Sequence, residues 1–142
     1  MTNINSLPTI FLTVNLFSAS AFATDIKSET FIVESKTDYS GELPKMFFEP
    51  EVIEIHVGDT IKWINTSEEY HNVAFPTDPN GNSSKETSID LFKKGDSWSY
   101  TFTKEGVFDY TCKPHVIFKM KGKVIVKPLR VHHRKVSLFR NS

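Results

Sequence analysis

The chain has 142 residues, with 17 basic and 17 acidic side chains that give a formal net charge of zero. This length suits one domain with a buried core. All 17 acidic residues lie between Asp25 and Asp109, whereas residues 128–142 contain four Arg or Lys and no acid. The central part is therefore acidic, which gives no reason to expect nucleic-acid binding.

The first 23 residues differ in composition from the rest. The run PTIFLTVNLF is apolar but too short and too interrupted for a bilayer-spanning helix. Ala21-Phe22-Ala23 then matches the small-x-small pattern of a signal peptidase site, although no basic residue precedes the apolar run. We therefore expect residues 1–23 to be a signal peptide that is removed, giving a periplasmic protein without stable membrane insertion.

Strand-like segments recur through the middle of the chain. Short runs alternate apolar and polar residues and are bounded by Gly, Pro, Asn and Asp, which is typical of an all-β protein. Ile53 and Ile55, for example, alternate with Glu54 and His56. The predicted strands cover residues 30–35, 52–57, 60–65, 71–75, 97–102, 107–112 and 122–127. About seven to eight strands in this length predict a Greek-key β-sandwich over residues 24–127.

Two segments do not show this alternation. Residues 76–96 are mostly polar and are predicted to form a long surface loop, with a short helical turn near Ile89–Phe92. Residues 128–142 begin with Pro128, which breaks a strand, and are basic. We expect them to form a flexible or loosely docked tail.

Cys112 is the only cysteine, so it cannot form an internal disulfide of the kind that secreted domains often use. Alternation along residues 107–112 places Cys112 on the same face as Phe108 and Tyr110. Because that aromatic pair is expected to face the core, the thiol should point into one end of the sandwich. It is then an inert buried thiol or a ligand.

The segment after Cys112 contains two further candidate ligands. Pro114 ends the strand, His115 follows at the turn, and Met120 comes just before the last predicted strand. A fourth ligand should come from another strand, and His71 is the best candidate because it follows a loop directly. His56 is less suitable because its alternation places it on the outward face.

The proposed ligand set is His71, Cys112, His115 and Met120. One thiolate, two imidazoles and one thioether are the ligands of a blue-copper electron-transfer site. The alternatives are Met120 as a core residue, a Cys112 nucleophile with His115 as its base, and a zinc site, for which Met is a poor ligand. A nucleophile would need an exposed thiolate, whereas Cys112 is predicted to face inward.

The order and spacing of these motifs resemble the cupredoxin family, in its plastocyanin/pseudoazurin branch, over about residues 30–127. The matching motifs are Phe48-x-Pro50, Gly58-Asp59-Thr60 with Trp63 and Asn65, His71-Asn72-Val73, Gly106-x-Phe108-x-Tyr110, Cys112-x-Pro114-His115, and Met120 with Gly122-Lys123-Val124. The resemblance implies a protein that binds one copper ion, shuttles single electrons and is not itself an enzyme. It also implies that Asn72 pins the cysteine loop.

The expected partners are redox proteins that dock transiently. Val116, Ile117 and Phe118 form an apolar patch beside His115, and a short apolar contact suits the weak encounters of electron carriers. We expect a monomer. Two other functions stay open: a periplasmic copper carrier or delivery protein, and an electron-transfer subunit of an oxidase or reductase.

Overall fold

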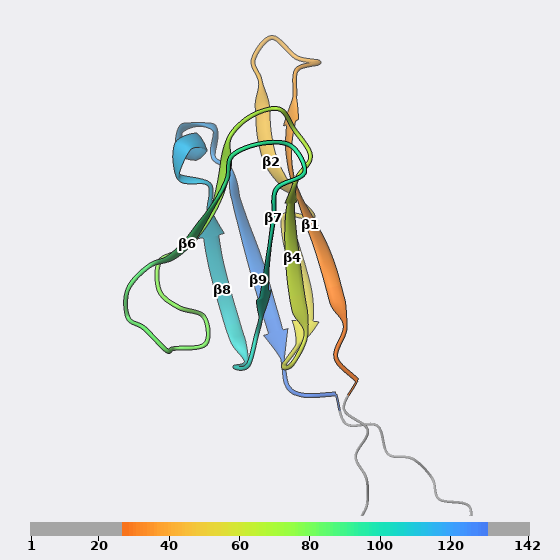
Figure 1. Cartoon of the computed structure of the whole chain (residues 1–142), viewed down its shortest axis with the longest axis vertical. Coiled ribbons are helices and arrows are strands. Elements are labelled where there is room, and N and C mark those ends of the chain that lie inside the picture. The colour runs from red at the N-terminus through yellow and green to blue at the C-terminus, as the bar shows by residue number, and fades with distance from the viewer. Residues whose placement is uncertain (1–26, 131–142) are drawn as a thin grey trace, which may run out of the picture.

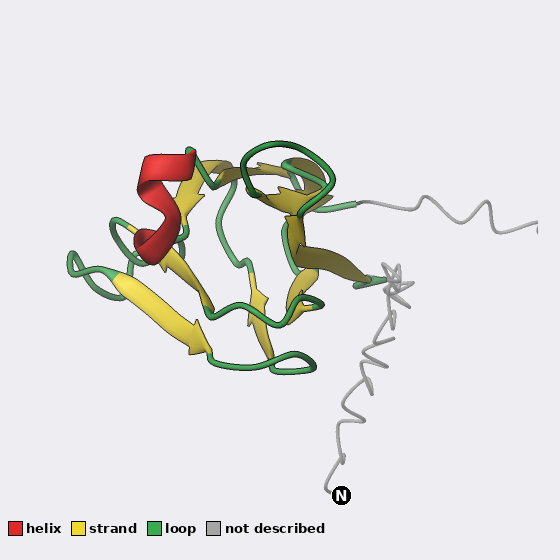
Figure 2. Cartoon of the chain, turned by 90° about the horizontal axis from the view of Figure 1, so that it is seen from above, coloured by secondary structure: helices red, strands yellow, loops and turns green. Residues whose placement is uncertain are grey.

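The computed structural model describes residues 27–130 and shows two β-sheets that face each other (Figures 1 and 2). One sheet has the strand order β2-β1-β4-β7 and the other β3-β9-β8-β5-β6. The strands are β1 (Thr30–Asp38), β2 (Lys45–Glu49), β3 (Val52–His56), β4 (Thr60–Asn65), β5 (His71–Phe75), β6 (Thr87–Leu91), β7 (Ser97–Thr101), β8 (Gly106–Thr111) and β9 (Lys121–Lys127). The predicted all-β sandwich is confirmed, with nine strands in the described part rather than seven to eight.

Two of these strands were not predicted. In β2, Met46 and Phe48 face the core, but Phe47 between them is also apolar and conceals the alternation. The helical turn expected near Ile89–Phe92 is wrong. Residues Thr87–Leu91 instead form the edge strand β6, which pairs with β5, and its middle positions face solvent. Polar residues at an edge strand are common, because they discourage pairing with other chains.

Aromatic side chains fill the space between the sheets. The buried Trp63 ring meets Phe75 and Tyr110 edge to face, with centroid distances of 5.9 and 5.5 Å, and stacks on Trp98 at 5.2 Å. Such contacts contribute beyond the burial of apolar area alone. Gly122 is required beside this cluster, because a Cβ atom there would collide with the Tyr110 ring. The core thus fixes β8 against β9, the two strands that flank the cysteine loop.

At one end of the sandwich, a charged cluster joins the first and last described segments. Arg130 lies 3.0 Å from Glu29 and 3.2 Å from the buried carboxylate of Asp59, and its Nε donates to Nδ1 of His56 at 3.0 Å. Arg130, in the described part of the predicted tail, therefore contacts the sandwich. We call Glu29, His56, Asp59 and Arg130 the arginine cluster.

Several sequence predictions lie outside the described residues. These are the signal peptide over residues 1–23, its cleavage before Thr24, and the tail from residue 131 onward. Between residues 27 and 130, no helix is long and apolar enough to cross a membrane.

Candidate metal centre

The loop between β8 and β9 lies at the opposite end of the sandwich from the arginine cluster (Figure 1). Cys112 follows β8 directly, and a short 3₁₀ helix, η1 (Lys113–Phe118), carries His115. The loop closes on itself, because the Cys112 amide donates to the Met120 carbonyl at 3.1 Å and the His115 amide donates to the Cys112 carbonyl at 3.0 Å. Lys119 adopts a left-handed conformation and redirects the chain into β9.

Three predicted ligands come together in the structure. The ligand atoms of His71, Cys112 and His115 all lie within 4.8 Å of one another. Nδ1 of His115 is 3.1 Å from Nδ1 of His71 and 3.3 Å from Sγ of Cys112, and the His71–Cys112 pair is separated by 3.7 Å. Two imidazole nitrogens and one sulfur thus face one another, and each can donate a lone pair to a metal.

The cluster is buried unevenly. His71 and Cys112 are fully buried, whereas His115 is partly exposed. Burial, reinforced by the neighbouring His115, lowers the pKa of His71 to about 4. Burial also lowers the pKa of His115 and raises that of the Cys112 thiol. Both imidazoles are therefore neutral at pH 7, as metal ligation requires, and binding of a cation would release the thiol proton.

Asn72 holds the cysteine loop, as the family resemblance implied. Its side-chain oxygen accepts a hydrogen bond of 2.8 Å from the Lys113 amide, and its backbone amide donates to Sγ of Cys112 at 3.4 Å. The first bond fixes the chain immediately after the cysteine. The second places a donor beside the sulfur, which favours the thiolate over the thiol.

Met120 lies in the same buried cluster as Cys112 and is 1% exposed. Its amide donates to the His115 carbonyl at 3.3 Å, and its carbonyl accepts from the Cys112 amide, so its backbone is bonded to both residues. His56 lies apart in the arginine cluster, where its Nδ1 accepts from Arg130. The structure thus places His71, and not His56, beside Cys112 and His115, as expected from the sequence.

Two neighbours of His71 were not predicted. Oγ of Ser67 lies 2.8 Å from Nε2 of His71, and Oγ1 of Thr37 lies 3.5 Å from the same atom. Ser67 stands four residues before His71 in the sequence, which offered a weak signal. Thr37 lies at the end of β1, beyond the strand predicted over residues 30–35, and only the pairing of distant strands brings it close.

Comparison with known proteins identifies the family. Residues 34–127 match the family model described as copper binding proteins, plastocyanin/azurin family. The chain belongs to this family. The cupredoxin resemblance read from the loop and from His71 is thus confirmed over two thirds of the chain.

Individual cupredoxins agree with this assignment. Amicyanin from Paracoccus denitrificans is 37% identical over 86 residues, a match that covers 61% of this chain and 63% of that protein. Plastocyanin from Nostoc punctiforme is 32% identical over 130 residues, covering 84% and 88%. A solved structure of the reduced Cu(I) form of an amicyanin mutant at pH 4 has a TM-score of 0.57 and 34% identity, and covers 69% of this chain and 82% of that one.

The donor atoms of this cupredoxin fit copper. A sulfur and two imidazole nitrogens suit a metal that cycles between a soft and a borderline state, whereas Mg²⁺ and Ca²⁺ prefer oxygen ligands. No carboxylate belongs to the group of ligand atoms found between residues 27 and 130. Copper is therefore the cofactor that both the family and the donor set indicate.

Proposed function

We propose that this chain is a single-electron carrier whose one copper ion is held by His71, Cys112, His115 and Met120. The observation that carries the proposal is the convergence of two imidazole Nδ1 atoms and one Sγ atom within 4.8 Å at a buried end of the sandwich. Bound copper supplies a Cu(I)/Cu(II) couple at this position. Catalytic residues are not part of the proposal, because the four ligands leave no position for a substrate.

Each type of ligand has a distinct role in this proposal. The Cys112 thiolate favours the reduced metal, the imidazoles suit both oxidation states, and a weak Met120 thioether keeps the potential high. The loop is held by its own hydrogen bonds and by Asn72. Ligands held in this way move little between oxidation states, so little reorganisation opposes electron transfer.

The apolar patch beside His115 supports docking of a redox partner at this end. Val116, Ile117 and Phe118 are 55%, 83% and 39% exposed, and the Phe118 ring lies 6.1 Å from the His115 ring. Of the three clustered ligands, His115 alone reaches the surface. Small apolar contacts permit the fast, weak encounters that suit a shuttle, and the proposal includes a monomeric carrier.

The proposal places the mature protein in the periplasm. Its support is the apolar run and the Ala21-Phe22-Ala23 motif, so that residues 1–23 are removed, residues 24–127 form the copper domain and residues 128–142 form a basic tail. N-terminal sequencing of the exported protein tests the cleavage site. A mature chain that begins well away from Thr24 contradicts this assignment.

An electrochemical experiment separates the shuttle from a copper-delivery protein. The copper-loaded protein should give a reversible one-electron wave and retain one copper per chain after many cycles in the presence of a copper(I) chelator at equal concentration. If the protein instead loses its copper to the chelator as fast as it is reduced, a copper-delivery function is favoured. Co-purification with one partner at equal stoichiometry would instead favour a subunit of an oxidase or reductase.

A further inference from the structure

A hydrogen-bonded chain of side chains runs from the β4–β5 connection to the back of His71. Its first member is Asn65, which is fully buried. The Asn65 side-chain amide donates to the carbonyls of Glu69 and Leu91 at 2.7 and 3.3 Å, and its oxygen accepts from the Ser67 amide at 2.9 Å. A flipped amide would place oxygen against two carbonyls, so these three backbone groups fix its orientation.

The fixed Asn65 oxygen determines what the Ser67 hydroxyl does. Oγ of Ser67 lies 3.1 Å from the Asn65 oxygen, which can only accept. Ser67 therefore donates its single hydroxyl proton to Asn65. Its oxygen keeps lone pairs, and the Glu69 amide already donates to one of them at 3.3 Å.

His71 must then be the donor to Ser67. Nε2 of His71 lies 2.8 Å from Oγ of Ser67, whose own proton is already used. A neutral imidazole carries one proton, so a protonated Nε2 leaves Nδ1 bare. That bare Nδ1 is the atom 3.1 Å from His115 and 3.7 Å from the Cys112 sulfur.

We propose that Ser67 is a positioning residue of the metal centre, because its hydroxyl, oriented by Asn65, holds His71 in the tautomer whose free Nδ1 faces Cys112 and His115. The inference rests on the proposed function in taking His71 as a copper ligand. Partners on the second nitrogen of ligating histidines commonly act in this way, and their loss weakens metal binding about 10- to 100-fold. Here the partner is a serine hydroxyl rather than a carboxylate or backbone carbonyl.

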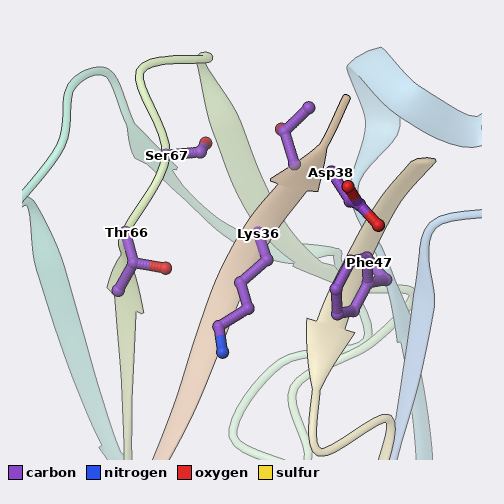
Figure 3. A pocket seen from close by; sticks show the side chains of 6 residues that line it. Lys36, Asp38, Phe47, Thr66 and Ser67 are labelled. Atoms are coloured by element: carbon purple, nitrogen blue, oxygen red, sulfur yellow. The ribbon is translucent and has the colours of Figure 1, made fainter. Parts of the chain in front are cut away.

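The setting of Ser67 makes the inference testable by a mild substitution. Ser67 and Thr66 line an open pocket of about 340 Å³ whose opposite wall is formed by Lys36, Asp38 and Phe47 (Figure 3). Removing a hydroxyl at the edge of such a pocket leaves no closed cavity, and the Ser67 amide still donates to Asn65. We therefore expect Ser67→Ala to fold.

The experiment combines two measurements on full-length mature protein. In the copper-free protein at pH 7, ¹⁵N–¹H correlation spectra of the imidazoles should show His71 as the Nε2–H tautomer, and Ser67→Ala should give a mixture of tautomers. Competition with a copper(I) chelator should show about 10-fold weaker binding in Ser67→Ala and near-complete recovery in Ser67→Thr. Thr66→Ala is the matched control, since the Thr66 hydroxyl donates to the Ser35 carbonyl at 3.2 Å.

Three results would overturn the inference. They are an Nδ1–H tautomer for His71 in the unsubstituted protein, an unchanged tautomer and affinity in Ser67→Ala, or equal losses of affinity in Ser67→Ala and Thr66→Ala. Failure of the proposed copper site, on which the inference rests, looks different, because copper then fails to bind the unsubstituted protein at all. The tautomer measured without copper still tests the role of Ser67 in that case.

Discussion

Each end of the sandwich contains histidine in a polar cluster. In only one of the two clusters do the side chains find their hydrogen-bond partners among neighbouring protein groups. In the arginine cluster, Nδ1 of His56 accepts from Arg130, and the buried Asp59 carboxylate accepts from two backbone amides besides facing the guanidinium. At the metal centre, two imidazole nitrogens and the Cys112 sulfur face one another. The first cluster is complete without any ligand, whereas the second brings lone pairs together.

This difference separates a structural histidine, His56, from the proposed ligand His71. Buried polar groups are nearly always paired, and buried imidazole nitrogens that face only a weak thiol donor carry a free-energy cost that a bound cation removes. The protein tolerates that cost at the metal centre because the core and the loop hydrogen bonds hold the cluster together. We therefore expect stability to depend on copper at one end only, since a ligand that binds the folded state stabilises it.

The largest expected effect contrasts His71 with His56. His71→Ala removes a proposed ligand and should weaken copper(I) binding by more than about 100-fold, beyond the range seen when only a supporting partner is lost. His56→Ala should leave the affinity unchanged, because His56 lies in the arginine cluster. Chelator competition measures both. Equal losses in the two variants would contradict the distinction between the two ends.

A smaller effect is expected from Arg130. Arg130→Ala removes the ion pairs to Glu29 and Asp59 and the hydrogen bond to His56. Asp59 keeps its two amide donors, so we expect a loss of about 2 kcal/mol in the free energy of unfolding, within the range for hydrogen bonds to charged groups. Urea denaturation measures this loss. A change in copper affinity with unchanged stability would reverse the roles assigned to the two ends.

The smallest expected effect is at Asn72, which connects β5 to the cysteine loop. Asn72→Ala removes the acceptor of the Lys113 amide and should destabilise the copper-free protein by about 1 kcal/mol. The backbone amide of Asn72 still donates to Cys112, so the sulfur keeps that contact. Denaturation of copper-free and copper-loaded protein checks this. A loss confined to the copper-loaded form would contradict a structural role for the side chain.

Local sequence patterns predicted the parts of the site that lie on one segment. Alternation along β8 placed Cys112 inward beside Tyr110, and Pro114 marked the end of the strand. The position of His71 followed from its place at a strand start. These predictions succeeded because strand periodicity and loop spacing are local properties.

Two of the missed features depend on contacts between distant segments. Thr37 contacts His71, and Arg130 contacts His56, only through tertiary packing, which no local pattern encodes. The role proposed for Ser67 depends on the orientation of a buried amide, Asn65, that three backbone groups determine. Strand β6 was missed because its exposed edge carries polar residues.

The most direct test of the copper proposal is the visible absorption spectrum of the Cu(II)-loaded protein, with Cys112→Ser as its control. A thiolate ligand in a His-His-Cys site with a weak axial Met should give intense blue or green colour that reduction abolishes and that the Cys112→Ser protein lacks. A Cu(II) protein that is colourless, or whose colour survives Cys112→Ser, would contradict the assignment of this centre.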